Sequence, residues 1–215
     1  MKQLLQNLIK KGNIKDLDVE DIGGGEIVRR LRPTLFSEAV RKIPTVNLSK
    51  CGVTRGQIRE LLRGGLQSDS KLRSLNISFN TQLSLLQTEL ISSIANLETL
   101  NLSGCDLTPS QISILFRDIR DKNYPRDLDI SYNNLSQVEL EMISRVLSSS
   151  LSPLRRLNLS YSQLTQERIV FLLTDLYVGP VVRRTLDIRQ DLPAQQLAAI
   201  REEARKLNIV DKLRI

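Results

Sequence analysis

The stretch that decides the fold is Leu97-Glu98-Thr99-Leu100-Asn101-Leu102-Ser103-Gly104-Cys105, because it recurs along the chain. Its frame, LxxLxLxxN/C, fits again at 43–51, 72–80 and 154–162, and with substitutions at 125–133 and 183–191. Weaker copies lie at 14–22 and 210–215. The fourth-position residues are Leu17, Val46, Leu75, Leu100, Leu128, Leu157, Leu186 and Leu213, at spacings of 29, 29, 25, 28, 29, 29 and 27 residues. Self-similarity at such a period indicates a solenoid of stacked repeats.

This frame resembles a leucine-rich repeat, and its length is similar to that of the ribonuclease-inhibitor-like class. The ninth positions carry the resemblance further, because they alternate between cysteine and asparagine: Cys51, Asn80, Cys105 and Asn133. The resemblance covers residues 14–215. It implies an α/β fold, a right-handed solenoid or horseshoe with a parallel sheet on the concave face and helices on the convex face. It also implies a non-catalytic module for protein–protein interaction, and members of the class differ in their partners.

The uninterrupted repeat predicts a single domain over residues 1–215. Residues 1–13 place Leu4, Leu5, Leu8 and Ile9 at helical spacing, which predicts an N-terminal capping helix. Repeats then fill 14–191, and 192–215 should form a C-terminal helix, near Ala194–Leu207, and a last strand. An uncovered last strand would present a sheet edge, so we expect self-association through this edge.

Each repeat should read strand, turn, helix and return. Four capping-box patterns mark helix starts, in which a Ser or Thr precedes a Gln or Glu by three residues: Thr54 and Gln57, Ser84 and Gln87, Thr108 and Gln111, Ser136 and Glu139. The expected buried helix stripes are Ile58, Leu61 and Leu62; Ile112, Leu115 and Phe116; Leu140, Ile143 and Leu147; Ile169, Leu172 and Leu173. The third repeat is short, so a shorter or irregular helix is expected there.

Three features favour a cytoplasmic or nuclear protein over a secreted one. The first residues lack the apolar run of a secretory signal. Cys51 and Cys105 occupy equivalent slots two strands apart, roughly 10 Å, which is too far for a disulfide. Five N-x-S sequons, at Asn47, Asn76, Asn101, Asn134 and Asn158, would attract glycans in the secretory pathway, and four of them fall on expected strands.

The sequence offers no recognisable catalytic chemistry. It contains no histidine among 215 residues, which removes the Ser-His-Asp triad, the Cys-His pair and imidazole metal ligands. Its two cysteines lack the CxxC spacing of a zinc site. We therefore predict no enzyme activity, no cofactor and no metal, and we expect the ninth-position side chains to bond the turn backbone of an adjacent repeat.

The expected concave face is lined by the third, fifth and seventh positions of the frame, since neighbours on a strand alternate faces. These rows are mostly Asn, Ser, Thr and Asp, which gives few of the aromatic or Arg anchors typical of interface centres. They are read either as a solvated sheet or as a partner surface. The candidate partner-binding residues on it are Asn76, Asn101, Asp129, Asn158 and Arg156.

The eighth position places aromatic residues along one rim of the sheet. Phe79, Tyr132 and Tyr161 are three of only eight aromatic residues in the chain. Exposed aromatics beside a polar sheet are typical of binding anchors. The alternative is that each ring folds over its own turn as packing.

Basic residues gather in the N-terminal half. Between Arg29 and Arg73, eleven Lys and Arg residues face three acidic ones, within a chain of net charge +7. The candidate basic surface comprises Arg55, Arg59, Arg63, Lys71 and Arg73. It is read as a solvated helix face, or as a surface for nucleic acid, anionic lipid or an acidic protein. A further alternative, taken from proteins with similar repeats, is a regulator of a small GTPase.

Overall fold

The computed structural model describes residue 7, residues 15–19, 28–65, 67, 69–86, 97–122, 125–149, 152, 154–177, 185–208 and 213–215. Asn7 is helical, and the rest of the expected capping helix lies outside the described residues. None of the described helices combines the length and the apolar character needed to cross a membrane.

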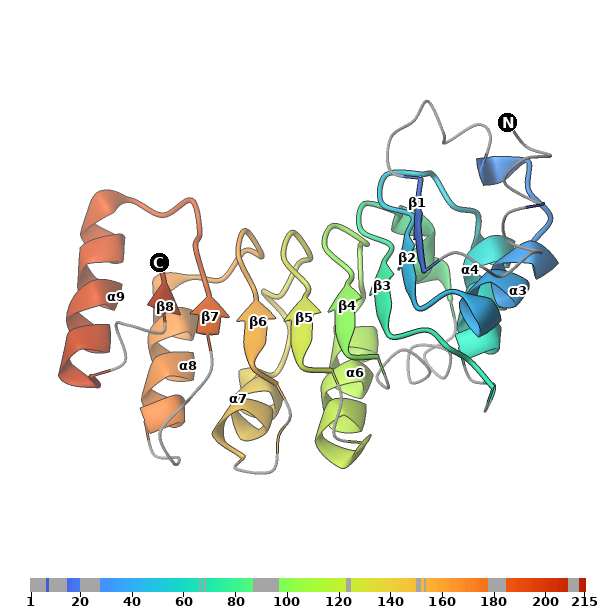
Figure 1. The fold of residues 1–215 in the computed structure, drawn as a ribbon. Helices are drawn as coiled ribbons and strands as arrows, with labels where there is room; N and C mark the ends of the chain where they lie inside the picture. The colour runs from blue at the N-terminus through green and yellow to red at the C-terminus, as the bar shows by residue number, and fades with distance from the viewer. Residues whose placement is uncertain are drawn as a thin grey trace.

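Eight short parallel strands form one open sheet in which every strand pairs with the next along the chain. They are β1 (Asp16–Asp18), β2 (Thr45–Asn47), β3 (Ser74–Asn76), β4 (Thr99–Asn101), β5 (Asp127–Asp129), β6 (Arg156–Asn158), β7 (Thr185–Asp187) and β8 (Leu213–Arg214). Figure 1 shows them side by side in chain order. The expected eighth strand is therefore present.

The strand register follows the sequence frame. Every fourth-position residue pairs with its equivalent in the next repeat, from Leu17 with Val46 to Leu186 with Leu213. A slip of one residue would turn these buried side chains to the opposite face, so the apolar pattern fixes the pairing. The predicted α/β solenoid is confirmed.

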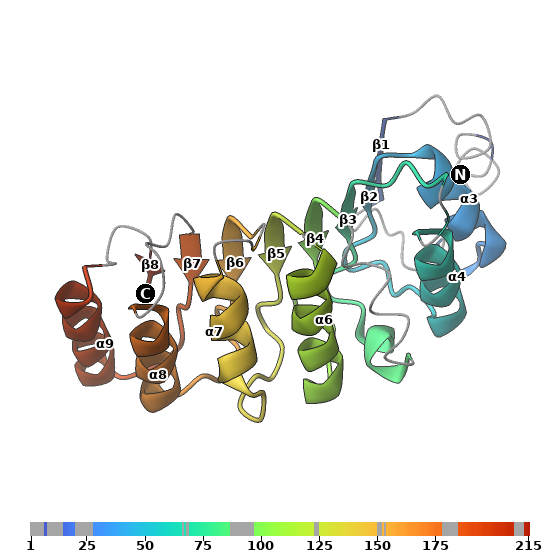
Figure 2. The ribbon, with the colours of Figure 1, turned by 90° about the horizontal axis from the view of Figure 1, so that it is seen from below.

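The helices lie on one side of the sheet (Figure 2). They are α3 (Thr34–Lys42), α4 (Arg55–Gly65), α6 (Pro109–Lys122), α7 (Leu140–Ser148), α8 (Gln166–Tyr177) and α9 (Ala194–Lys206). All the helix residues predicted to form buried stripes are buried, and Phe116 is among the largest side chains with almost no exposed surface. One core therefore runs the length of the solenoid between sheet and helices, because a single repeat cannot enclose a core.

In the third repeat the described chain forms a short 3-10 helix after β3, η1 (Thr81–Leu85). Residues 87–96, where most of the expected shorter or irregular helix would fall, lie outside the described residues. Ser84 lies inside η1 and donates to the carbonyl of Thr81, so it does not cap a helix. Its expected partner Gln87 lies outside the described residues.

Capping boxes form in two of the repeats and fail in the fifth. In α4 the Gln57 side chain accepts from the Thr54 N–H at 2.9 Å, and Gln111 does the same for Thr108 in α6. Each of these glutamines also donates from Nε2 to carbonyls of the preceding repeat. The prediction for Ser136 and Glu139 is wrong, because α7 begins only at Leu140 and Glu139 is exposed.

The failure at Glu139 has a chemical reason. A carboxylate only accepts hydrogen bonds, so Glu139 has no donor for the carbonyls that Gln57 and Gln111 bind in their own repeats. Ser136 instead donates, from its N–H and its hydroxyl, to Oδ1 of Asn134. The equivalent residue of the sixth repeat, Arg168, keeps the donor role by bonding the carbonyls of Leu135 and Val138.

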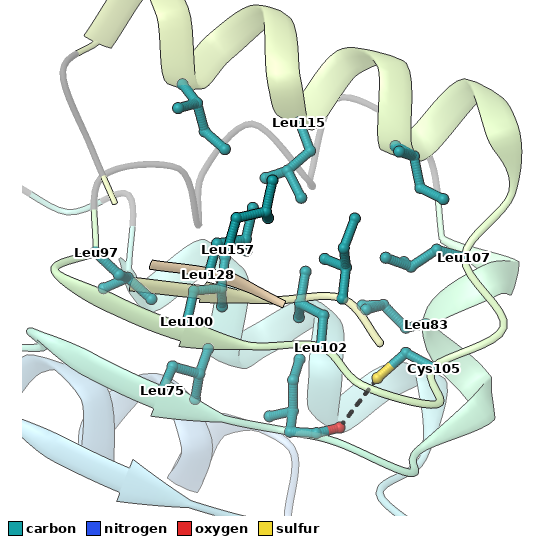
Figure 3. Packing of buried hydrophobic residues seen from close by; sticks show 14 of the residues in the cluster. Leu75, Leu83, Leu97, Leu100, Leu102, Cys105, Leu107, Leu115, Leu128 and Leu157 are labelled. Carbon is teal, nitrogen blue, oxygen red and sulfur yellow. Dashed lines mark hydrogen bonds between the residues drawn. The ribbon is translucent and has the colours of Figure 1, made fainter. Parts of the chain in front are cut away.

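The ninth-position side chains tie neighbouring repeats together, as expected. Asn133 donates from Nδ2 to the carbonyls of Leu102, Ile130 and Ser131 and accepts the N–H of Leu107 on Oδ1, at 2.9 to 3.2 Å. Asn80, two repeats earlier in the chain, makes the equivalent set of hydrogen bonds. Cys51 and Cys105 are free, fully buried thiols, and each donates to a carbonyl of the preceding repeat. Figure 3 shows Cys105 in this position among the core leucines.

The seventh-position serines correct one expectation. Ser49, Ser78, Ser103, Ser131 and Ser160 are buried, so they offer little surface to a partner, although Ser78 and Ser131 donate to the fifth-position side chains Asn76 and Asp129. Each strand holds only the third to fifth positions of the frame, and the chain turns directly afterwards. The exposed part of the concave sheet is therefore narrower than strict alternation predicts.

Candidate functional site

Phe79, Tyr132 and Tyr161 form a continuous row of rings, here named the aromatic strip. The Phe79 and Tyr132 ring centroids are 5.9 Å apart with tilted planes, and the Tyr132 and Tyr161 rings stack with centroids 4.9 Å apart. Phe79 is 44% exposed and Tyr132 51% exposed, which places both among the few large apolar side chains open to solvent. The structure therefore brings together the three aromatic residues that the sequence placed on one rim.

The backbone beneath the strip is left-handed. The angle φ is +56° at Phe79, +55° at Tyr132 and +52° at Tyr161, and Lys50 and Gly104 adopt the same conformation at their eighth positions. Glycine enters this region freely, whereas bulky residues are seldom found there, at a cost of roughly 1–2 kcal/mol each. The turn after each strand imposes the conformation, and the sequence fills it with aromatic rings at three positions.

Gly104 allows the strip to cross a repeat that contributes no ring. Phe79 and Tyr132 belong to the third and fifth repeats, and the Phe79 ring lies over the intervening Gly104. A Cβ atom on Gly104 would lie only 2.6 Å from Cδ1 of Phe79. The absence of a side chain at residue 104 is therefore required for the contact between Phe79 and Tyr132.

A cation lies at each end of the strip. The Lys50 ammonium lies 5.8 Å from the Phe79 ring centroid, within cation–π range. Arg189, near the other end, forms a bidentate pair with Asp187 at 2.9 and 2.7 Å. The hydrogen bonds and the charge of Asp187 raise the pKa of Arg189.

The fifth-position side chains beside the strip are engaged in turns. Oδ1 of Asn76, Asn101, Asp129 and Asn158 each accepts the N–H two residues onward, at 2.9 to 3.0 Å. These are Asx-turns, which stabilise the reversal after each strand. Four of the five candidate residues on the sheet therefore have a structural role in addition to any role in binding.

A shallow hollow lies over β4 to β8, with a volume of about 510 Å³. The predicted residues Asn101, Asp129, Arg156 and Asn158 line it, whereas Asn76 lies outside it on β3. Arg156 pairs with Asp127 through two hydrogen bonds of 2.8 and 2.6 Å, and the interaction raises the pKa of Arg156. Asn158 donates to Asp129 at 2.8 Å. Neighbouring side chains thus neutralise much of the charge in the hollow.

Comparison with known proteins agrees with this repeat geometry. The family model described as Leucine Rich Repeat matches residues 96–117, which hold β4 and the start of α6. The match and the repeat geometry together support a leucine-rich-repeat protein. A crystal structure of the leucine-rich repeat-containing protein LegL7 from Legionella pneumophila is similar, with a TM-score of 0.56 and 15% identity over 88% of this chain and 69% of that one. No curated protein matches the sequence.

Similarity to leucine-rich-repeat proteins suggests a protein–protein interaction module, and such proteins are generally non-catalytic. The described part of the chain contains no group of three or more His, Cys, Asp or Glu residues that could hold a metal ion. Burial raises the pKa of the Cys105 thiol to about 12, so this cysteine remains protonated and unreactive.

The residues of the candidate basic surface fall into two groups. Arg55, Arg59 and Arg63 are exposed at four-residue spacing along α4, and Arg63 pairs with Glu60 at 3.4 Å. Lys71 and Arg73 are exposed on the segment that leads into β3. Within the described ranges Arg55 and Arg59 form no ion pair, which is the condition of a solvated helix face.

The sequence did not assign a role to Gly104 or Arg189, although both were visible in the repeat frame. Gly104 interrupts the aromatic row at the eighth position, and Arg189 replaces the serine of the seventh position in the last full repeat. A departure from the repeated residue was the available signal in both cases.

Proposed function

We propose that the protein is a non-catalytic interaction module that binds a protein partner through the aromatic strip and the neighbouring concave sheet. The observation that carries the proposal is the strip itself, in which three solvent-accessible rings contact one another across four repeats. Large aromatic side chains supply most of the energy of many protein interfaces. The adjoining sheet would contribute polar contacts from Asn76, Asn101, Asp129, Asn158 and Arg156.

The backbone conformation supports binding over simple packing. At Gly104 the same turn is made with glycine, so the repeat does not need an aromatic ring at this position. Rings at Phe79, Tyr132 and Tyr161 add strain at each turn, and Phe79 and Tyr132 remain substantially exposed while Tyr161 is partly exposed. Strained residues persist where the surrounding structure holds them, and they concentrate at functional sites.

The test is binding by variants that remove rings from the strip. Tyr132→Ala and Tyr161→Ala should each weaken capture of the partner at least tenfold, since truncated hot spots typically cost about 2 kcal/mol or more. Affinity purification from a cell lysate with mass spectrometry would identify the partner, and titration with that partner would measure the loss. Circular dichroism of each variant would establish that the repeat fold is intact.

A second pair of variants separates the strip from the basic helix face. Arg59→Glu combined with Arg63→Glu should mainly slow association and reduce its salt dependence, because charges at the rim act on the encounter rate. If this variant loses all binding while the tyrosine variants bind normally, the convex basic surface is the site. Binding of nucleic acid or anionic vesicles, or acceleration of GTP hydrolysis, by the wild-type protein would support the corresponding alternative function.

The proposed location is the cytoplasm or nucleus. Cys51 and Cys105 are both free and buried, as in proteins from reducing compartments. The sequon residues Asn76, Asn101 and Asn158 end strands and hold turns through their side chains. Expression with a secretion signal, followed by analysis of glycan occupancy and folding, would test whether the fold tolerates the secretory pathway.

A further inference from the structure

Beside the aromatic strip, Asn76 and Asn101 use their acceptor oxygens within the protein and leave their amide donors available. Oδ1 of Asn76 and of Asn101 is occupied by an Asx-turn N–H. Their Nδ2 groups make no hydrogen bond within the described part of the chain. The hydroxyls of Tyr132 and Tyr161 likewise have no hydrogen-bond partner among the described residues. The strip therefore combines apolar rings and hydroxyl groups with available amide donors at Asn76 and Asn101.

A ligand that complements this surface must carry hydrogen-bond acceptors and apolar rings, and it must have few N–H donors of its own. Among peptides this description fits a proline-rich segment. Proline has no N–H, and the polyproline II helix leaves its carbonyls without internal hydrogen bonds. Its pyrrolidine rings pack well on aromatic surfaces, and the preformed helix loses little entropy on binding.

The dimensions of the strip agree with such a ligand. The centroid separations of 5.9 and 4.9 Å set the distance from Phe79 to Tyr161 at about 11 Å or less. A turn of polyproline II contains three residues and rises roughly 9 Å. Two prolines three residues apart would therefore contact opposite ends of the strip.

Charge defines the flanks of the ligand. Lys50 lies beyond Phe79, Arg189 lies near Tyr161, and the whole chain carries a net charge of +7. Acidic side chains also lie in this region: Asp187 is paired with Arg189, Asp129 accepts hydrogen bonds from Ser131 and Asn158, and exposed Asp106 follows Cys105 in the loop. With a cation at each end, the strip is complementary to acidic residues on either side of a proline core.

We infer that the aromatic strip binds a proline-rich segment in the polyproline II conformation, flanked by acidic residues. The inference rests on the proposed function, because it names the partner chemistry of the same surface. The peptide carbonyls accept hydrogen bonds from the tyrosine hydroxyls and from Nδ2 of Asn76 and Asn101. The prolines pack against the rings of Phe79, Tyr132 and Tyr161.

The probe is a fluorescein-labelled peptide with a run of consecutive prolines between pairs of glutamates, titrated with the whole chain by fluorescence anisotropy. The wild-type protein should bind it, and replacing the prolines by glycine should weaken binding at least tenfold, since glycine lacks the ring and the preformed helix. Replacing the glutamates by lysine should also weaken binding. At high salt the glutamate and lysine peptides should bind equally well, whereas the proline peptide should still bind more tightly than the glycine peptide.

Conservative substitutions test the role of the strip without removing any of its rings. Tyr132→Phe keeps the ring and removes the hydroxyl, so binding should weaken about two- to tenfold, the effect of one lost hydrogen bond. Gly104→Ala should disrupt the strip without removing any ring, because its Cβ displaces Phe79. Gly52→Ala is the control: it occurs at a φ of +57° and displaces Arg29 rather than an aromatic ring. It should leave peptide binding unchanged.

The outcomes distinguish this inference from the proposed function. If the wild-type protein does not bind the proline probe at about 1 mM, or binds the glycine peptide equally well, the inference is wrong. The proposed function still stands in that case if Tyr132→Ala abolishes binding of the purified natural partner. If Tyr132→Ala binds both the probe and the partner as the wild type does, both proposals fail.

Discussion

The left-handed backbone at Tyr132 leads to a specific prediction about stability. We compare two substitutions, Tyr132→Ala and Tyr132→Gly, which both remove the ring and its contacts with Phe79 and Tyr161. Alanine keeps the Cβ atom that makes a φ of +55° unfavourable, whereas glycine has none. The usual expectation that the glycine variant is the less stable of the two should therefore be reversed.

The magnitude follows from two opposing contributions. Relief of the left-handed strain should favour the glycine variant by roughly 1–2 kcal/mol. The greater freedom of glycine in the unfolded chain should oppose this by about 0.4–1 kcal/mol. We expect the free energy of unfolding of Tyr132→Gly to exceed that of Tyr132→Ala by about 1 kcal/mol, or about 2–4 °C in melting temperature for a chain of this size.

Urea denaturation followed by circular dichroism would measure the difference, provided that both variants unfold with the same m-value. Val138→Gly and Val138→Ala, at a buried position whose φ is not among the positive values, provide the control, and there alanine should be the more stable. An advantage for alanine in the Tyr132 pair would show that the left-handed backbone carries no penalty that glycine relieves, and the aromatic strip would then not be strained.

Four further predictions concern the frame of the solenoid. Asn133→Ala should destabilise the protein by about 3 kcal/mol, because it leaves buried backbone groups without hydrogen-bond partners. The control Asn134→Ala, at an exposed position, should cost about 1 kcal/mol or less. Chemical denaturation of both variants would show whether the hydrogen bonds of the ninth-position side chain stabilise the fold. Cys105→Leu should destabilise by roughly 1–3 kcal/mol through overpacking. Folding raises the pKa of the Cys105 thiol from 9.0 to about 12. The free energy of unfolding should therefore decrease as the pH rises above about 9, where the thiol ionises in the unfolded chain but not in the folded one. The same pH dependence from 8 to 11 in the wild type and in Cys105→Ala would contradict this prediction. The outer edge of β8 should support concentration-dependent association, and sedimentation that shows only monomer at high concentration would argue against it.

Helix boundaries show where sequence reasoning met its limit. The pattern of a Ser or Thr three residues before a Gln or Glu was correct at Thr54 and Thr108 and wrong at Ser136. The pattern treats glutamine and glutamate alike, since both can accept from the cap N–H. In this fold the same side chain also donates to the preceding repeat, and only glutamine can do both. The second requirement comes from the neighbouring repeat and is invisible in an isolated helix.

The sequence by itself determined the register of the solenoid. Each repeat must place an apolar residue at the same height of the sheet and a donor at the ninth position. The spacing of the leucines and the row of ninth-position residues therefore specify which residues stack. That row consists of Cys51, Asn80, Cys105 and Asn133. These are contacts between equivalent positions of adjacent repeats, and a one-dimensional pattern is sufficient to describe them.

Only the tertiary structure decided the character of the candidate site. The contact of Phe79 with Tyr132 spans a whole repeat and exists because Gly104 leaves space between them. The donor character of the surface arises because the turns occupy Oδ1 of Asn76 and Asn101 and leave Nδ2 available. The first property depends on side-chain direction after the strand ends, where the chain leaves the strand geometry and alternation no longer predicts which way a residue faces. The second depends on the turn that follows each strand, which brings an N–H to the last strand residue.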